Sequence, residues 1–366
     1  MRLMSEEQTM IRDMAAGFLD EKAPVDALRK QRDSGGGYDR ALMGEMADMG
    51  WFGMLLDEES GGVDMGAEAA GLVAEEMGRR LSASPFLSSG VMSAVVLRAT
   101  GGADWAAKLA SGEAVVAMAI DERVKHRPDA IATTAEKSGN GFVLNGAKRF
   151  VSDGAGADRV IVTAMTEDGL GLFLVDPGLE GVQSRALKTV DSRDAADLRF
   201  DNVQLDGAAL LAMGDAAQEA LDGALRVGRA VASAEMVGVS KEMAERTNAY
   251  LKERKQFGIA LSNFQALQHR AADLYTQIQT TDAAVAAALR AIDEGSDDAE
   301  LLSRVAKAKA GKTASLAVRE ALQMHGGIGM TDALDIGLFM KKARACAEYL
   351  GDGECHGDWL LRQRGL

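Results

Sequence analysis

The chain has 366 residues, of which 47% are apolar, and its formal net charge is -14. An acidic chain repels nucleic acid and anionic membrane surfaces, so neither is expected as a partner. Cys346 and Cys355 are the only cysteines, which excludes a disulfide framework and a structural zinc site. No signal-peptide core and no run of about 20 apolar residues occurs, so we expect a cytoplasmic protein.

The first third of the chain has a helical pattern. Ser5, followed by two glutamates, predicts a helix N-cap, and apolar residues recur after it at helical spacing. Further helices are predicted over residues 67–80 and 85–100, and glycine-rich loop signals precede them. We therefore predict an N-terminal helical domain over residues 1–112.

The pattern changes near Gly112. Six short segments rich in β-branched residues follow, separated by turn signals such as Asp168-Gly169, with no helical pattern between them. Such a succession of strands and turns is typical of an antiparallel sandwich or barrel. The sequence therefore predicts a middle β-domain over residues 113–210.

Helical spacing returns from about Asp215 and continues to the end of the chain. Leu221, Leu225 and Met236 lie on overlapping helical faces. Long helices of this kind usually build a bundle, so a four-helix bundle domain is predicted over residues 211–366. The fold class is therefore α+β, in the order helical, β, helical.

Three motifs contain residues suited to ligand chemistry. Arg254-Lys-Gln-Phe-Gly258, followed by Phe264-Gln265, offers a phosphate clamp and a flat apolar ring. Gln323-Met-His-Gly-Gly-Ile-Gly329 is a turn where a ligand can approach backbone N–H groups. Lys148-Arg-Phe-Val-Ser-Asp-Gly154 places a ring and a hydroxyl on one face of a strand. Taken singly, the first motif is equally compatible with an ordinary helix end, whereas the second is more typical of a helix C-cap and the third of a strand edge.

The order and spacing of these motifs resemble the acyl-CoA dehydrogenase family over nearly the whole chain. The resemblance implies an oxidoreductase with FAD as cofactor, an acyl-CoA substrate from fatty acid or steroid degradation, and an electron-transfer flavoprotein as acceptor. It implies a tetramer in which FAD reaches across a subunit interface. It also implies FAD contacts from Phe150, Ser152, Arg254, Gln256, Phe257, Gln265, Gln323, Gly326, Gly327 and Asp352.

Within that set, the resemblance gives the residues different parts of the cofactor. Phe150 would lie beside the isoalloxazine, and the Ser152 hydroxyl near the flavin N5. Arg254, Phe257 and their neighbours would hold the ADP half of FAD in a neighbouring subunit. Asp352 would contact the cofactor rather than the substrate.

The family chemistry needs a carboxylate that removes the α-proton of the thioester while the flavin accepts the β-hydride. In this chain Leu350 stands at the usual position of that base, and Gly228 stands at the position that other members use. Residues 121–129 replace the family's Thr-Glu-Pro…Gly-Ser-Asp signature and contain no Gly-Ser pair. Contacts to a neighbour's FAD are therefore kept, while those to the chain's own FAD and base are degraded.

Three hypotheses follow. The first is a base-lacking small subunit, similar to those of heteromeric acyl-CoA dehydrogenases of the pimeloyl-CoA and steroid side-chain type, which completes the FAD site of a partner. The second is a self-sufficient homo-oligomer that uses Glu235 as base, although a helix-face glutamate more often pairs with Lys or Arg. Asp121 and Asp153 are weaker candidates. The third is a non-catalytic member that binds FAD or CoA or supports an assembly. No metal site is predicted, because the Glu354-Cys355-His356 run cannot converge on one ion.

Overall fold

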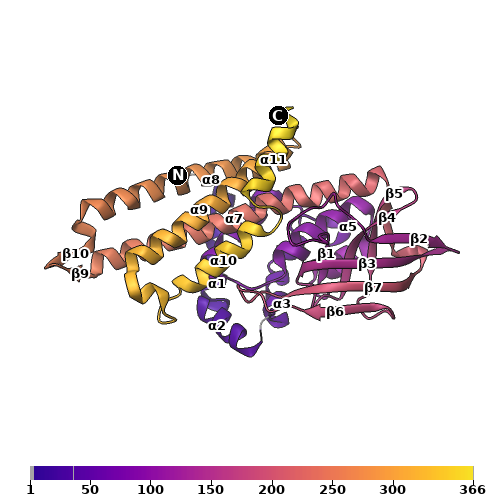
Figure 1. Ribbon diagram of the computed structural model, residues 1–366, viewed down its shortest axis with the longest axis horizontal. Helices are drawn as coiled ribbons and strands as arrows, with labels where there is room; N and C mark the ends of the chain where they lie inside the picture. The colour runs from indigo at the N-terminus through magenta and orange to yellow at the C-terminus, as the bar shows by residue number, and fades with distance from the viewer. Residues whose placement is uncertain (1–3, 36, 366) are drawn as a thin grey trace. The chain divides into compact units, whose positions relative to one another are not determined.

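The structure is a computed structural model that describes residues 4–35 and 37–365 (Figure 1). Its elements follow the order helical, β, helical, which confirms the predicted fold class. The helices of the first third are α1 (Glu6–Lys22), α2 (Val25–Ser34), α3 (Arg40–Asp48), α4 (Gly66–Arg80), the π-helix η3 (Phe86–Ser93), α5 (Ala94–Thr100) and α6 (Ala103–Ala110). Ser5 caps α1 through a capping box with Gln8, as its position in the sequence predicts.

The middle of the chain contains the strands. They are β1 (Val116–Ala119), β2 (Thr134–Ser138), β3 (Gly141–Ser152), β4 (Arg159–Thr166), β5 (Gly169–Val175), β6 (Val182–Ala186), β7 (Ala195–Leu205) and β8 (Leu210–Met213). The six predicted segments correspond to six of these eight strands. The sequence pattern missed β6 and β8, which are short and carry no fully buried side chain.

The last part of the chain is helical apart from one small hairpin. It comprises α7 (Asp215–Glu253), β9 (Lys255–Gln256), β10 (Ile259–Ala260), η5 (Leu261–Asn263), α8 (Gln265–Asp293), α9 (Ala299–His325), η6 (Gly326–Met330), α10 (Ile336–Glu348) and α11 (Gly353–Gln363). Among the described helices, none is long and apolar enough to cross a membrane.

The backbone forms two compact units that cut across the three sequence regions. The bundle unit contains the described residues up to Leu28, Gly71–Ser82 and the chain from Arg229 onward. The sheet unit contains Arg29–Ala70 and Ala83–Gly228. Helices α4 and α7 each continue from one unit into the other, which a domain division drawn from sequence patterns does not foresee.

The sheet unit is built on one eight-stranded sheet in the order β6-β7-β3-β2-β4-β5-β8, with β1 also paired to β4. Most neighbouring strands are antiparallel, as predicted, whereas β1 and β2 run parallel to β4. The reason is that neither pair is consecutive in the chain, so no tight hairpin fixes its direction.

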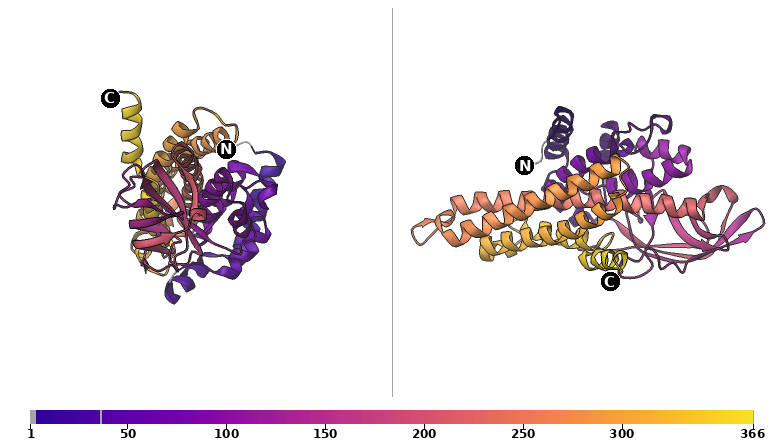
Figure 2. Two further views of the ribbon diagram at one scale, coloured as in Figure 1. Left: turned by 90° about the vertical axis from the view of Figure 1, so that its right-hand side faces the viewer. Right: turned by 90° about the horizontal axis from the view of Figure 1, so that it is seen from above.

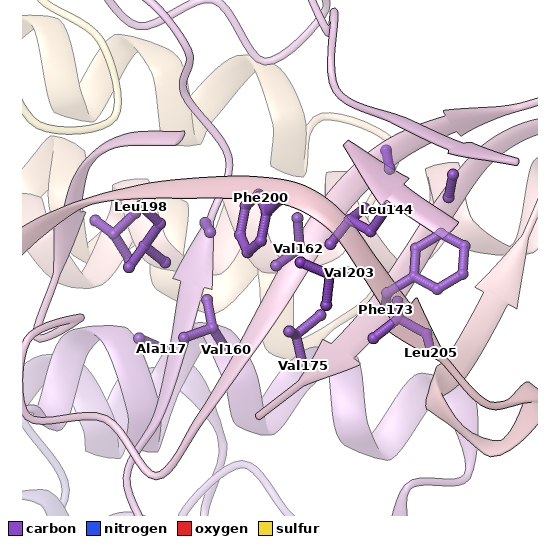
Figure 3. Close-up of a cluster of buried hydrophobic side chains, with 14 of the residues drawn as sticks. Ala117, Leu144, Val160, Val162, Phe173, Val175, Leu198, Phe200, Val203 and Leu205 are labelled. Carbon is purple, nitrogen blue, oxygen red and sulfur yellow. The ribbon is translucent and has the colours of Figure 1, made fainter. Parts of the chain in front are cut away.

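One face of this sheet holds the apolar core (Figure 3). The side chains of Val160 and Val162 on β4 point toward Phe173 and Val175 on β5 and Phe200 on β7. Alternate residues of a strand share a face, and each of these five is almost fully buried. Leu144 and Val151 of β3 belong to the same core, which anchors the strand whose last residues form the first part of the candidate site.

In the bundle unit, α7, α8, α9 and α10 lie side by side, and Figure 2 shows the same helices from two further sides. Helix α4 crosses α7 at two glycines. A Cβ atom on Gly78 would lie 2.0 Å from the carbonyl oxygen of Glu235, and one on Gly238 would lie 1.9 Å from that of Glu75. Because real atoms never approach so closely, only glycine allows this crossing.

Candidate functional site

The predicted flavin-edge motif lies at the end of β3, where the strand bulges. Register shifts between Lys148 and Val151 place Phe150 at φ +51, with its side chain 48% exposed. The Phe150 N–H donates to the Asp197 carboxylate at 3.1 Å, and the Arg149 guanidinium lies 5.2 Å from the ring centroid. Ser152, the last residue of the strand, is half-buried. The bulge therefore presents an accessible aromatic ring and a nearby hydroxyl.

Asp197, which the sequence analysis missed, holds this bulge. Its carboxylate also accepts from Arg185 Nη2 at 2.5 Å and lies 3.7 Å from Arg149 Nη2. Its pKa is lowered: burial opposes the shift, but hydrogen bonds from Arg185 and the Phe150 N–H outweigh it. No sequence signal marked it, because an aspartate on the polar side of a strand is ordinary until its partners on another strand are known.

The loop between β1 and β2 uses its own carboxylates to satisfy its backbone. Asp121 accepts from the Arg127 N–H and pairs with His126 Nδ1, both at 2.8 Å. Glu122 accepts from the Ala132 and Thr133 N–H groups and from Lys148 Nζ. The loop stands where the family has its Gly-Ser signature. The N–H groups of Arg127, Ala132 and Thr133 are thus engaged by carboxylates of the same loop.

The Arg254 motif forms an exposed hairpin at the far end of α7 and α8 (Figure 1). Arg254 follows α7 directly, Gln256 lies on β9, and both side chains are exposed. Phe257 occupies the turn at φ +55 with 90% of its side chain exposed, and its ring meets the edge of Phe264. Exposing a phenylalanine so fully costs free energy that a bound ring could recover.

The glycine-rich turn lies at this same end of the bundle unit. The Tyr250 ring stacks on His325 with centroids 4.2 Å apart, which brings the end of α9 against the end of α7. Gln323 is exposed, and Gly326 ends α9 at φ +65. A Cβ atom on Gly327 would meet nothing within 4 Å. Gln265 is exposed as well, at the start of α8. The structure therefore gathers Arg254, Gln256, Phe257, Gln265, Gln323, Gly326 and Gly327 at one end.

The turn after α10 contains Leu350, at the position where the family resemblance expects the catalytic carboxylate. This turn is buried. Leu350 is 3% exposed and sits at φ +59, an unusual conformation for a leucine, and Gly351 follows at φ +97. Lys307 Nζ, fully buried on α9, donates to the carbonyls of Ala347 at 3.1 Å and Gly351 at 2.9 Å. Burial lowers the pKa of Lys307 to about 8. A residue with a strained backbone persists only where its surroundings stabilise it. Lys307 stabilises Leu350 through its hydrogen bonds to the carbonyls on either side of it.

Asp352 caps the helix that follows. Its carboxylate accepts from the Cys355 N–H at 2.9 Å, at the start of α11. The thirteen residues of α10 separate it from the glycine-rich turn, which is about 20 Å of helix at 1.5 Å per residue. A single chain therefore does not bring Asp352 together with the hairpin, although both are predicted FAD contacts.

The alternative base positions lie on α7. Gly228 precedes Arg229, whose buried guanidinium pairs with Glu300 at 2.9 Å. Glu235 is buried and lies 2.5 Å from Lys342 Nζ, with Cys346 Sγ donating to its other oxygen at 3.5 Å. Its carboxylate is therefore part of an ion pair inside the bundle unit.

Comparison with known proteins agrees with this arrangement. Three domain families match successive parts of the chain: acyl-CoA dehydrogenase N-terminal domain over residues 5–113, middle domain over 118–203 and C-terminal domain over 218–364. The chain belongs to the acyl-CoA dehydrogenase family. Members of this family are FAD-dependent oxidoreductases that act on CH–CH bonds of acyl-CoA thioesters.

Individual acyl-CoA dehydrogenases match over nearly their whole length. Acyl-CoA dehydrogenase IpdE2 of Mycobacterium tuberculosis (strain ATCC 25618 / H37Rv) is 29% identical, covering 94% of this chain and 93% of the relative. A chain of the Tcur3481-Tcur3483 steroid ACAD, solved as a variant, is 29% identical with a TM-score of 0.89, covering 99% of both chains. A glutaryl-CoA dehydrogenase of Mycobacterium smegmatis, solved in complex with FADH2, has the same fold with a TM-score of 0.90 at 23% identity, covering 98% and 95%.

Lys307 and Lys342 were also missed in the sequence, but a signal for Lys307 existed. It stands among Ser303, Ala306 and Ala310, at the three- and four-residue spacing of a buried helix face. A lysine on such a face must find acceptors inside the protein. Its position on α9 therefore pointed to a buried contact, although not to the turn that it holds.

Proposed function

We propose that this chain takes part in FAD-dependent α,β-dehydrogenation of an acyl-CoA thioester as the subunit that lacks the catalytic carboxylate and completes the FAD site of a partner subunit. The observation that carries the proposal is the pair of base positions. Leu350 and Gly228 occupy them, and neither side chain can accept a proton. The partner subunit would supply the base.

The local structure around Leu350 supports this proposal. Leu350 is buried at φ +59, and Lys307 holds its turn through hydrogen bonds to the carbonyls of Ala347 and Gly351, so the turn is built around an apolar side chain. The candidate Glu235 pairs with Lys342 inside the bundle unit. Removing an α-proton would need that carboxylate to leave its ion pair, which leaves Lys342 buried and unpaired.

The exposed hairpin supports the second half of the proposal. Arg254 can clamp a phosphate, Phe257 can cover an adenine ring, and Gln256 can donate to ligand oxygens. In the family, FAD supplies the hydride-accepting flavin. The residues of this chain would bind and orient its ADP half in the partner. In the loop between β1 and β2, backbone N–H groups donate to the carboxylates of Asp121 and Glu122. This agrees with a cofactor that the other subunit mainly binds.

The assembly we propose is a hetero-tetramer that passes electrons to an electron-transfer flavoprotein. Its substrate would be the CoA ester of a fatty or steroid-derived acid. The likeness to the steroid ACAD supports a steroid-derived acid, because that protein matches 99% of this chain.

Flavin absorbance of the purified chain tests the proposal. The chain alone should be colourless and should not be reduced by acyl-CoA. Co-expressed with an acyl-CoA dehydrogenase chain that keeps the glutamate, it should yield a yellow complex that acyl-CoA reduces under anaerobic conditions. A stoichiometric yellow protein that acyl-CoA reduces without a second chain would overturn the proposal.

A self-sufficient homo-oligomer that uses Glu235 is the second candidate, and Glu235→Gln separates it from the first. If Glu235 is the base, the variant loses flavin reduction. If Glu235 only pairs with Lys342, the variant loses about 3–5 kcal/mol of stability, because it leaves a buried charge unpaired. Lys342→Met is the matched control, since it breaks the same pair without removing a carboxylate. Flavin that binds without any turnover would favour the non-catalytic alternative.

A further inference from the structure

A buried contact in the sheet unit joins the turn after β3 to the π-helix η3. Ser88 Oγ lies 2.5 Å from Asp153 Oδ2, and both residues are almost fully buried. Asp153 sits at φ +58, and its N–H donates to the carbonyl of Asp194 at 2.9 Å. It directly follows Ser152, the residue that the family resemblance places near the flavin N5. Because π-helical turns occur often at functional sites, the position of this contact points to a role beyond packing.

The number of protons in this contact decides its chemistry. Ser88 Oγ lies within hydrogen-bond distance of two acceptors, Asp153 Oδ2 and the Pro85 carbonyl oxygen at 3.3 Å. A hydroxyl carries one proton and can donate only once. If Asp153 were ionised, one of the two contacts would lack a proton. If Asp153 carries the proton, it donates to Ser88 Oγ, and Ser88 donates to Pro85.

The surroundings of Asp153 also favour the protonated acid. Burial is the largest influence and raises the pKa of Asp153 to about 7. The charged groups that face it are Arg193, Asp191 and Asp194 from the loop between β6 and β7, and the neutral phenol of Tyr38 faces it from the segment before α3. One cation among two acids does not compensate a further buried negative charge.

We propose that Asp153 keeps its proton in the folded chain at mildly acidic pH, and that the chain of hydrogen bonds from Asp153 through Ser88 to Pro85 is a proton-dependent latch. The latch ties the Ser152 turn to the first residues of η3. Asp153 is thus a positioning residue and not a substrate base. The rest of η3 does not depend on this proton, because Ser89 accepts from the Val116 N–H and Ser93 donates to the Val116 carbonyl.

The latch lies wholly within the sheet unit, so it goes beyond the proposed function and does not depend on which subunit holds FAD. A carboxylate that forms above neutral pH would take the single Ser88 proton, so Ser88 would stop donating to the Pro85 carbonyl and the start of η3 would lose that bond. The sign of the effect on stability follows from the two ionisations. The unfolded acid ionises near 3.8 and the folded acid near 7, so stability is lost as pH rises between these values.

Asp153→Asn tests the latch, because an amide donates to Ser88 without a titratable proton. Denaturant unfolding of the full chain from pH 4 to 8 should show a smaller loss of stability with rising pH in the variant than in the wild type. Infrared spectra at pH 6 should show a protonated carboxylic acid band in the wild type that is absent from Asp153→Asn. Asp197→Asn is the control, since Asp197 is ionised and paired with Arg185, and it should leave the band unchanged.

Hydrogen exchange separates the latch from a buried acid without a mechanical role. Amides at the start of η3 should exchange faster as the pH passes about 7 in the wild type, after correction for intrinsic exchange, and should not do so in Asp153→Asn. Ser88→Ala should show the faster exchange at every pH. Equal pH slopes for wild type and Asp153→Asn, or no acid band in the wild type, would overturn the protonated acid. An acid band with unchanged exchange would overturn the latch.

Discussion

The two ends of helix α10 in the bundle unit differ in how their residues are used. At one end, the hairpin of Arg254 and Phe257 and the glycine-rich turn expose their side chains and backbone. At the other end, the turn of Leu350 and Gly351 is buried and held by Lys307. In the function that we propose, the exposed end would bind a partner's FAD, and the buried end carries a leucine where a base would stand. The proposal thus assigns cofactor binding and catalysis to different parts of this fold.

Removing the lysine under the turn should have the largest effect. Lys307→Met leaves two buried carbonyls without their donor and should cost about 2–4 kcal/mol of unfolding free energy. Urea denaturation of the chain measures it. Lys309→Met on the same helix should change stability by less than about 0.5 kcal/mol, because Lys309 is partly exposed. Equal losses from both variants would mean that the turn is not held in this way.

Substitutions in the exposed hairpin of Arg254 should change the affinity for FAD and leave the stability of the chain unchanged. Arg254→Ala removes a charge-assisted contact worth about 1.5–3 kcal/mol, so FAD affinity of the assembled enzyme should fall about 10–100-fold. Flavin retention on dialysis and FAD titration measure it, while urea denaturation of the chain should be unchanged. Lys255→Ala is the neighbouring control. If it weakens FAD as much, the hairpin contributes only general positive charge.

The pH dependence of stability tests the buried turn separately, because Lys307 is a titratable group. Burial lowers the pKa of Lys307 to about 8 from 10.5, so the folded chain releases this proton before the unfolded chain does. Stability from this group therefore rises as pH goes from about 8 to 10.5, by at most about 1.4 kcal/mol per pH unit. The stability gap between wild type and Lys307→Met should change over that range, in favour of the wild type. A constant gap would show that Lys307 does not lose its proton there.

Gln265 should give the smallest effect. A neutral hydrogen bond contributes about 0.5–1.5 kcal/mol, so Gln265→Ala should weaken FAD binding of the assembled enzyme about 2–10-fold. Gln268→Ala, one turn further along α8, is the control and should bind FAD like the wild type. A loss as large as that of Arg254→Ala would place Gln265 closer to the phosphates than the family resemblance implies.

Much of the fold was predictable because its signals are local. The capping box at Ser5, the helix over residues 67–80 and the six strongest strands each depend on residues close together in the chain. The parallel pairing of β1 and β2 with β4 was not predictable, since it joins segments without a hairpin between them. The two compact units were not predictable either, because α4 and α7 pass from one to the other.

The candidate site divides in the same way. Arg254, Phe257 and the glycine-rich turn were recognisable because each motif is a short run of residues with a fixed spacing. Asp197 and Ser88 were not, because they act on β3 and the turn after it from distant elements. Their residue types are common, and only their partners give them a role.

The sequence by itself determined the order of helical and β regions, the family and the absence of a carboxylate at residues 350 and 228. These follow from periodicity and from the identity of single residues, which folding does not alter. Only the tertiary structure decided what surrounds residue 350 and what holds the predicted motifs. It paired Glu235 with Lys342, placed Lys307 under Leu350 and brought Ser88 to Asp153. Long-range packing makes these contacts, and burial then sets their charge and proton requirements.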